Sequence, residues 1–398
     1  MLRKWVILLF GSCSYAAPNP FISVPNLSPA QPRDSLESRS SPSFTPVYNQ
    51  GDPGNGIGGY DLRSNADLSF SYDYNGSGKT DHLVLYRPGT GTVWILENNG
   101  GTFKPVYAEG DPGTGIAGYD LKSPDDRAFA FDYDSSGRLD HLVFYRPGRG
   151  AIFIVKRRGN TFKTVYTQRD GGSGIGGFDL KSSADKAFAF DYNGSGKQDH
   201  ICFYRPGTGT FWILRNVGGS FVAVYRQGDP GKGIGGYDLK SPADRAFAFD
   251  FNSSGKLDHI ALYRPGTGTF WILRNVGGSF TPVYSQGDPG SGIGGYDLIS
   301  PADRAFAFDW SGSGKADHLA LYRPGTGTFW VLEHTRGTAD FRAVLSEGDP
   351  GQGVGGYDLA SPEDKIFAFD YDHSKKSDHL VLYRTNASGT IWILKKSS

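Results

Sequence analysis

The sequence predicts an all-β protein, a six-bladed β-propeller of four-stranded antiparallel blades that is closed by the N-terminal strand joining the last blade. The first observation is a repeat: the dipeptide Asp-His begins at Asp81, Asp140, Asp199, Asp258, Asp317 and Asp378, with spacings of 59, 59, 59, 59 and 61 residues. The second is that each repeat contains four short runs rich in β-branched and aromatic residues, separated by Gly, Pro, Asn and Ser. The third is that no segment has the 3.6-residue period of an amphipathic helix. A fixed period of this kind indicates a repeat architecture, and four strands per repeat match a propeller blade.

The composition agrees with a large folded protein and argues against several other classes. Glycine accounts for 57 of the 398 residues, about twice its usual share, but without the Gly-X-Y period of collagen. Aromatic residues make up 14% of the chain, which excludes a disordered protein. Lys and Arg together number 41, as do Asp and Glu. The formal net charge is therefore zero, and no overall positive field favours nucleic acid as a partner.

The N-terminal residues predict secretion. Residues 1–17 combine a basic start, a short apolar run from Trp5 and small residues near Ala16, as a signal peptide does. Lipidation at Cys13 is an alternative that fits less well, because Phe10 stands where leucine is expected. No segment is apolar over the ~20 residues that a membrane-spanning helix needs. Residues 18–43 are rich in Pro and Ser and predict a linker, so the propeller is expected over 44–398. After cleavage only Cys202 remains, which leaves no internal disulfide.

Each element of a blade can be placed on the repeat 221–279. We expect strands at 221–225, 246–251, 259–264 and 269–273, with a glycine-rich connection before the second of these. The alternation of Ala246, Phe247, Ala248 and Phe249 fits the innermost strand. Neighbouring blades crowd the axis there, so small residues are needed at alternate positions, and the aromatic residues between them would fill the wedge between blades. The same alternation occurs in the repeats on either side.

One strand motif is out of step with the others and predicts how the ring closes. The outer-strand motif Phe-x-x-Val-Tyr begins at Phe44, Phe103, Phe162, Phe221 and Phe280, and in altered form at Phe341. No copy follows the last repeat, which ends near Trp392. We therefore predict that residues 44–48 form the outer strand of the last blade, which would remove the two open sheet edges of a linear array.

A nine-residue loop follows each inner strand and has the spacing of a metal-binding loop. Its pattern, D-x-[ND]-x-S-G-[KR]-x-D in most copies, resembles the calcium loop of FG-GAP and VCBS repeats. These repeats occur in integrin α-subunit propellers and in secreted fungal and bacterial propellers, several of which are lectins. The resemblance covers the six repeats, about 350 residues, and implies a calcium site that uses loop positions 1, 3, 5 and 9. The implied ligands are Asp73, Asn75, Ser77, Asp81, Asp132, Asp134, Ser136, Asp140, Asp191, Asn193, Ser195, Asp199, Asp250, Asn252, Ser254, Asp258, Asp309, Ser313, Asp317, Asp370, Asp372, Ser374 and Asp378.

The loops depart from the family pattern, and two interpretations stay open. Position 5 is Ser in all six loops, where the family has Asp, position 3 of the fifth loop is Ser311, and position 6 of the sixth loop is Lys375. With so few carboxylates, any Ca²⁺ affinity is expected in the weak range of about 10⁻⁴–10⁻³ M. The alternative is an Asx-turn without metal, whose side-chain oxygens cap backbone N–H groups. Asn75, Asn193 and Asn252 also form N-x-Ser sequons, and their glycosylation would block these loops as metal sites.

The histidine that follows each loop could suggest acid-base chemistry. Its sixfold repetition at the start of a strand favours a structural role instead, with a hydrogen bond between strands. The sequence contains no H-E-x-x-H or G-x-S-x-G motif and no Cys-His nucleophile pair.

The glycine-rich connection G-D-P-G-x-G-[IV]-[GA]-G-[YF]-D-L should lie on the same face as the Arg-Pro-Gly-Thr-Gly hairpin, opposite the Asp-Ser loops. This face would collect Tyr, Asp, Arg and Trp side chains. An aromatic ring beside a carboxylate and a guanidinium suits a neutral sugar, which offers C–H faces for stacking and hydroxyls for hydrogen bonds. The alternative is that these residues only fill and tie the blades. The candidate ligand-binding residues are Tyr60, Asp61, Arg87, Trp94, Trp212, Tyr237, Asp238, Arg264, Trp271, Tyr296, Asp297, Arg323 and Trp330.

The sequence therefore favours a secreted, multivalent lectin that binds glycans or glycoconjugates. Six similar repeats suit a binder that gains avidity from weak sites, whereas an enzyme needs one asymmetric site. A polysaccharide lyase or glycosidase and a protein-interaction propeller remain alternatives. The departures from the repeat are few: Leu68, Phe153, Arg169 with Asp170, Trp310, and His334 with the insertion before Phe341. They provide no two facing carboxylates.

Overall fold

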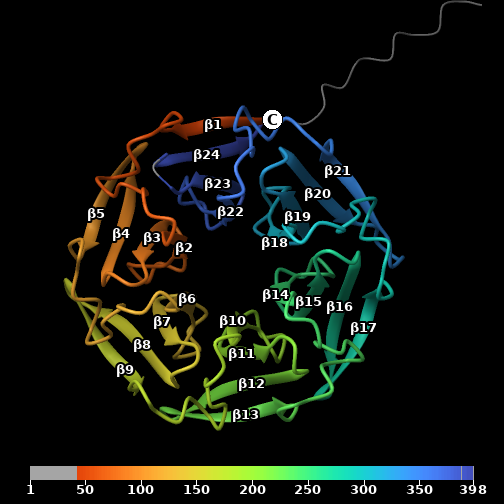
Figure 1. Cartoon of the computed structure of the whole chain (residues 1–398), viewed down its shortest axis with the longest axis horizontal. Helices are drawn as coiled ribbons and strands as arrows, with labels where there is room; N and C mark the ends of the chain where they lie inside the picture. Colours follow the sequence, from red (N-terminus) through yellow and green to blue (C-terminus); the bar gives the residue numbers. More distant parts are fainter. Residues whose placement is uncertain (1–42, 387, 398) are drawn as a thin grey trace, which may run out of the picture. The chain divides into compact units, whose positions relative to one another are not determined.

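The computed structural model describes residues 43–386 and 388–397. The predicted signal peptide and nearly all of the predicted linker lie outside these residues. Twenty-four strands form six separate four-stranded antiparallel sheets, each built from strands that pair in sequence order except for the last sheet. Figure 1 shows these sheets as blades around a common axis, which confirms the predicted six-bladed propeller. Among the described residues there is no helix that could cross a membrane.

The strands have the following bounds. Blade 1 contains β2 (Leu68–Tyr72), β3 (His82–Arg87), β4 (Thr92–Asn99) and β5 (Thr102–Ala108), and blade 2 contains β6 (Arg127–Phe131), β7 (His141–Arg146), β8 (Ala151–Arg158) and β9 (Thr161–Gln168). Blade 3 contains β10 (Lys186–Phe190), β11 (His200–Arg205), β12 (Thr210–Val217) and β13 (Ser220–Arg226), and blade 4 contains β14 (Arg245–Phe249), β15 (His259–Arg264), β16 (Thr269–Val276) and β17 (Ser279–Ser285). Blade 5 contains β18 (Arg304–Phe308), β19 (His318–Arg323), β20 (Thr328–His334) and β21 (Phe341–Glu347), and blade 6 contains β22 (Asp364–Phe369), β23 (His379–Arg384), β24 (Thr390–Lys396) and β1 (Phe44–Asn49).

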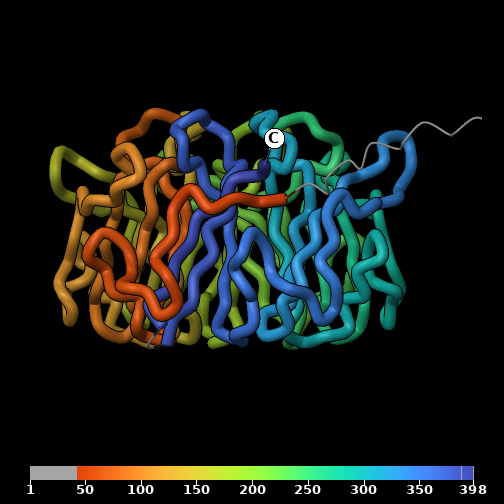
Figure 2. The backbone as a smooth tube through the Cα atoms, turned by 90° about the horizontal axis from the view of Figure 1, so that it is seen from above, coloured from red at the N-terminus to blue at the C-terminus, as the bar shows by residue number. Residues whose placement is uncertain are grey.

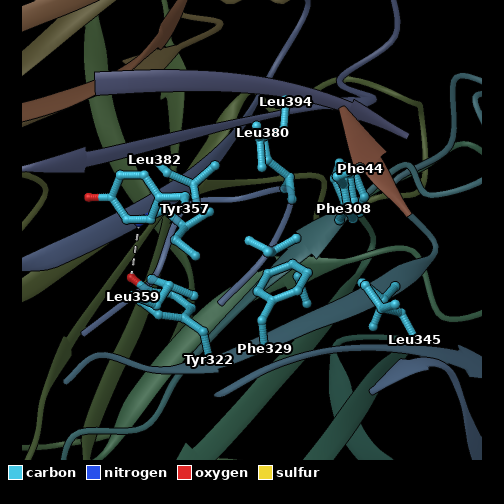
Figure 3. Packing of buried hydrophobic residues seen from close by; sticks show 14 of the residues in the cluster. Phe44, Phe308, Tyr322, Phe329, Leu345, Tyr357, Leu359, Leu380, Leu382 and Leu394 are labelled. Atoms are coloured by element: carbon cyan, nitrogen blue, oxygen red, sulfur yellow. Dashed lines mark hydrogen bonds between the residues drawn. The ribbon is translucent and has the colours of Figure 1, made fainter. Parts of the chain in front are cut away.

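The ring closes as predicted, through a strand from the start of the chain. β1 pairs antiparallel with β24, and Phe44 lies opposite Lys396 in the register. Phe44 is buried and packs against the rings of Phe308, Trp310 and Phe329, with centroid distances of 6.3, 5.5 and 6.1 Å (Figure 3). The two ends of the propeller are thus held together by a ladder and by a shared core, without a covalent hairpin.

The core lies between blades. In β15, as in the second strand of most blades, all six residues are buried, because both faces of the blade pack against a neighbour. In β14 the alanines pack on the preceding blade, whereas Phe247 and Phe249 pack on the following one. The prediction that the aromatic residues fill the wedge between blades is thus confirmed here. A tyrosine from each second strand ties the blades together near the axis. For example, the Ala246 N–H donates to the hydroxyl of Tyr204 at 3.0 Å, and the equivalent bond occurs at all six blade boundaries. The edge of each inner strand therefore has a partner in the preceding blade.

The loops gather at the two ends of the strands, as Figure 2 shows from the side of the ring. At one end the hairpin after β15 contacts the next connection: Gly266 N–H donates to Leu298 O at 2.9 Å, and Gly290 N–H donates to Thr267 O at 2.8 Å. The Asp-Ser loops, which join the first and second strands of each blade, are at the other end. This confirms the predicted division of the two faces.

Candidate functional site

An arginine at the end of each second strand gathers carboxylates from two connections, and Arg264 in blade 4 is typical. Its Nε donates to Asp244 Oδ1 at 2.8 Å, and its Nη2 donates to Asp244 Oδ2 at 3.0 Å and to Asp238 Oδ1 at 2.6 Å. Its Nη1 contacts Asp288 of the following connection. Asp244 also accepts a hydrogen bond of 2.8 Å from the Tyr237 hydroxyl. The arginine therefore ties both connections to the blade, and little of its donor capacity remains for a ligand.

Burial divides the charges of this cluster into an inner and an outer part. The side chain of Asp244 is fully buried and that of Arg264 is 9% exposed, whereas that of Asp238 is 54% exposed. Burial opposes ionisation of Asp238, but hydrogen bonds from Lys240 N–H and Arg264 outweigh it and lower the pKa of this carboxyl. The hydrogen bonds that Arg264 donates to Asp244 and Asp238 raise the pKa of its guanidinium. The cluster thus presents carboxylate oxygens to solvent while its guanidinium stays inside.

A tryptophan from the third strand stands beside this cluster. Trp271 is half-buried, and its indole Nε1 donates to Gln286 O at 2.5 Å. Its ring meets the Tyr237 ring edge to face at 5.9 Å. Gly236 lies against the indole, where a Cβ would be in ordinary contact with Trp271 Cζ3 at 3.4 Å, and its φ of +93° is what favours glycine at this position. The sequence thus places an aromatic ring at the outer rim of each blade boundary, with phenylalanine in its place in blade 2.

An open pocket lies on this surface in blade 3. Its volume is ≈ 600 Å³, and a pocket at the corresponding place in blade 2 has a volume of ≈ 430 Å³. Its walls are Gly176 and Gly177 of the connection, the Trp212 ring, and outer strand residues from Phe221 to Arg226. The guanidinium carbon of Arg226 lies 5.9 Å from the centre of the Trp212 ring. These outer-strand residues were not among the predicted site residues, because nothing in their sequence pattern distinguishes a pocket wall from a solvent-exposed face.

The corresponding pocket in blade 2 differs from its relatives. It has a volume of ≈ 430 Å³ and includes Tyr119, Asp120, Arg146, Phe153 and Asp170. Asp170 pairs with Arg149 at 3.0 Å and stays 3.7 Å from Arg146 Nη1, so this arginine retains a free donor. Phe153 and the segment that begins with Arg169 are departures from the repeat that the sequence already showed. They make one blade's site unlike the other five.

The structure brings the predicted ligand-binding residues together within each blade. In blade 1, Arg87 Nη2 donates a hydrogen bond of 2.6 Å to Asp61. The centre of the Tyr60 ring lies 5.5 Å from the guanidinium carbon of Arg87 and 5.9 Å from the centre of the Trp94 ring. The candidates of blades 4 and 5, and Trp212 in blade 3, occupy equivalent places. Equivalent clusters contain further residues that the prediction did not include: Tyr119, Asp120, Arg146, Phe178, Asp179, Arg205, Tyr357, Asp358 and Arg384. The repeat period would have found them.

The Asp-Ser loops use their first carboxylate to hold the turn. In blade 4, Asp250 Oδ1 accepts from Ser254 N–H at 2.8 Å and Oδ2 accepts from Gly255 N–H at 2.7 Å. The other five loops have the same two bonds, with Lys375 N–H in place of the glycine in blade 6. Burial nevertheless raises the pKa of Asp250 despite these bonds. Asn252 Oδ1 accepts a further bond from Ser254 N–H at 3.2 Å, so the loop is organised as an Asx-turn.

The ninth loop residue and the histidine after it form a pair of their own. The distance from His259 Nδ1 to Asp258 Oδ1 is 2.6 Å, and the other five pairs have distances of 2.7 Å. The expected structural role of the histidine agrees with this, but the expected partner on another strand was wrong. A histidine at the start of a strand reaches the neighbouring carboxylate more easily than a group across the sheet. The contact has the geometry of a hydrogen bond in blades 1, 4 and 5.

A lysine neutralises the two loops that carry a carboxylate at position 3. In blade 2, Lys156 Nζ lies 2.7 Å from Asp134 and 3.1 Å from Asp140, and in blade 6 Lys395 Nζ lies 2.9 Å from Asp372. Burial opposes ionisation of Asp134, but the bond from Lys156 prevails and lowers the pKa of Asp134 to about 2. Among the described residues, acidic and histidine side chains reach metal-ligand spacing only in Asp134–Asp140–His141 and Asp372–Asp378–His379. Neither group includes the first carboxylate of its loop.

Comparison with known proteins identifies the fold but no family. No family model matches the chain, and no curated protein matches it. Among solved structures, a lectin of Agrocybe aegerita that specifically recognises non-reducing terminal N-acetylglucosamine is 20% identical, with 89% of each chain covered and a TM-score of 0.50. An auxiliary nutrient binding protein of Bacteroides thetaiotaomicron is 10% identical, with 89% of this chain and 76% of that chain covered and a TM-score of 0.47. The likeness to the lectin shows the propeller fold alone, and the relationship to FG-GAP and VCBS repeats stays a prediction.

Proposed function

We propose that this protein is a secreted, multivalent carbohydrate-binding protein whose sites lie at the outer rim, between the glycine-rich connection and the outer strand of a blade. The observation that carries the proposal is the repeated surface around Trp94, Trp212, Trp271 and Trp330, which has an open pocket in blade 3 and an altered one in blade 2. The pocket volumes fall within the range of about 300–1,000 Å³ that is usual for small-ligand sites.

The chemistry of this surface suits a neutral sugar. The half-buried indole offers an apolar face for the C–H groups of a pyranose ring, and the exposed oxygens of Asp238 and its equivalents can accept hydrogen bonds from hydroxyls. The guanidinium contributes mainly by fixing these carboxylates, because it is already bonded to three of them. In blade 2, Arg146 can also donate to the ligand directly, since its third carboxylate has moved away to 3.7 Å.

The lectin of similar fold supplies the first ligand to test. Its structure concerns recognition of non-reducing terminal N-acetylglucosamine, and both chains are covered over 89% of their length. Glycans that end in N-acetylglucosamine are therefore the first probes on a glycan array, run both with Ca²⁺ and with a chelator. An array that stays silent under both conditions would contradict the proposed function.

Replacing Trp271 with alanine is expected to remove one binding site and leave the others. Calorimetric titration with a monovalent sugar should show a lower stoichiometry at an unchanged affinity, and agglutination should weaken because avidity depends on the number of sites. Trp271→Phe serves as a folding control, because Phe153 occupies the equivalent position in blade 2 and the fold therefore accepts phenylalanine there. Val276→Ala is the matched control: Val276 lies on the same strand and is 54% exposed. An unchanged stoichiometry in folded Trp271→Ala would place the sites elsewhere.

We propose further that any Ca²⁺ binding by the Asp-Ser loops is weak, with a Kd of about 10⁻⁴ M or higher. Two observations support this: the first carboxylate of each loop is hydrogen-bonded by two backbone N–H groups, and Lys156 already neutralises the loop in blade 2. Lys156→Met should therefore strengthen Ca²⁺ binding in calorimetry by releasing Asp134 and Asp140. Lys104→Met, on the exposed side of β5, is the control. Submicromolar binding by the unmodified protein would refute the proposal.

A further inference from the structure

We propose that Lys186, Arg245 and Arg304 form a binding site for a tetrahedral oxyanion, phosphate or sulfate, near the axis of the propeller at the end where the connections lie. Each of these residues is the first of its inner strand, in three consecutive blades (Figure 1). The site is distinct from the outer-rim pockets and does not depend on the proposed carbohydrate binding.

Among the described residues, the side-chain hydrogen bonds of Lys186 and Arg304 go to backbone oxygens and not to carboxylates. Each of the three cations follows directly after a buried aspartate, such as Asp244 before Arg245, but that carboxylate is fully buried and bonded to Arg264, Tyr237 and Ser241 N–H. Lys186 Nζ donates to the backbone oxygen of Asp244 at 3.2 Å, and Arg304 Nη1 donates to backbone oxygens at 2.6–3.3 Å. These bonds position the cations without neutralising their charge.

Arg245, the middle member, has an unused donor. Its Nε is buried and has no hydrogen-bond partner among the described residues. A ligand can reach this N–H only if the side chain shifts, because the atom has almost no solvent-accessible surface. An oxyanion offers several acceptor oxygens, and arginine binds phosphate and sulfate groups in preference to simple halides because two N–H groups can engage two oxygens.

Two other blades have an acidic residue near the cation at the start of their inner strand. Blades 2 and 6 also have a cation here, Arg127 and Lys365, but an acidic residue precedes it by two positions, Asp125 and Glu363 respectively. In blades 3, 4 and 5 that position is Ala184, Ala243 and Ala302. Blade 1 has no cation, because Leu68 begins its inner strand. Only in blades 3, 4 and 5, therefore, does the inner strand begin with a cation that has no acidic residue two positions before it.

The cations are close enough to repel one another. Burial lowers the pKa of Lys186 to about 8, and the charges of Arg245, Arg304 and Arg127 contribute to this. Burial also lowers the pKa of Arg304, with a further contribution from Arg245. A bound dianion would relieve this repulsion. A cavity of ≈ 340 Å³ lined by Lys186, Arg127, Tyr145 and Tyr204 lies at one end of this row of cations.

The test is thermal unfolding and calorimetry of the whole chain with sodium phosphate and sodium sulfate, against sodium chloride at matched ionic strength. A ligand that binds only the folded state raises the melting temperature with its concentration. Glucosamine 6-sulfate forms a further arm, to separate a free anion from a sulfate group carried by a sugar. We expect both inorganic dianions to stabilise the protein more than chloride does.

Two variants make the result specific. Arg245→Gln removes the middle cation, and Ala302→Glu adds the acid that blade 6 carries at the equivalent position, in a context the fold already accepts. Each is expected to weaken phosphate and sulfate binding about tenfold or more. Arg274→Gln makes the same change of charge on the exposed part of β16 and should leave binding unchanged. Equal stabilisation by chloride, or equal loss in Arg274→Gln, would overturn the site. A response to glucosamine 6-sulfate alone would assign it to sulfated sugars instead of free anions.

Discussion

Deleting residues 40–50 is expected to abolish the single cooperative unfolding transition of the propeller. The deletion removes β1, so β24 becomes an open edge and the core that Phe44 shares with Phe308 and Phe329 loses its cover (Figure 3). An exposed edge strand is also a template for aggregation. Differential scanning calorimetry should show a broad or split transition, together with loss of soluble protein. A melting profile unchanged from that of the full chain would refute closure by β1.

A point substitution tests the same closure without removing a strand. Phe44→Ala should lower the free energy of unfolding by about 3–5 kcal/mol, because it leaves a cavity in a packed core. Phe221→Ala is the matched control: Phe221 is similarly buried, at the same place in blade 3, but its strand is joined to β12 by a hairpin. Both variants should lose similar stability.

The two variants should differ in where the structure opens. β1 and β24 come from opposite ends of the chain, so weakening their contact allows a local opening that no covalent turn limits. Native-state hydrogen exchange of the β24 amides should therefore accelerate in Phe44→Ala and not in Phe221→Ala. Equal protection of the β24 amides in the two variants would show that the β1–β24 contact does not open separately from the rest of the propeller.

The fold could be predicted from local signals because each blade repeats them. The period located the blades, the alternation of alanine and phenylalanine located the inner strands, and the early copy at Phe44 located the closing strand. The period and the alternation are properties of consecutive residues, and the closing strand follows from the number of outer-strand motifs. None of these signals depends on distances between blades, and the structure contains all the elements that they predict.

The candidate site could be predicted only in part, because its chemistry depends on which groups are already engaged. The sequence placed Tyr237, Asp238, Arg264 and Trp271 together, but not the fully buried Asp244, which takes two hydrogen bonds from the arginine. It likewise could not show that Lys156 reaches two carboxylates of the adjacent loop. Such pairings are fixed by the register and twist of neighbouring strands, and several residue choices would satisfy the same local pattern.

Removing the arginine of one blade is expected to be among the most destabilising single changes. In Arg264→Ala, Asp244 remains fully buried with a charge that has lost its partner. Breaking a buried ion pair in this way costs about 3–5 kcal/mol, whereas Asp238→Asn, at a side chain that is 54% exposed, should cost less than about 1 kcal/mol. Arg264→Lys keeps the charge but not the two parallel bonds to Asp244, so it should fall between these values. Urea unfolding of the three variants checks this order.

A second substitution distinguishes an unpaired charge on Asp244 from lost packing as the cause of the lost stability. If the charge of Asp244 causes the loss, removing it as well, in Arg264→Met with Asp244→Leu, should restore much of the stability. The pH dependence should change too. Asp238 has a lowered pKa in the folded state, so its contribution is present above its ordinary pKa of 3.8 and is lost as the pH falls below that value. Without Arg264 this acid-sensitive contribution should shrink. A double variant no more stable than Arg264→Ala would instead show that the arginine stabilises the blade mainly through packing and its contact with the Tyr237 ring.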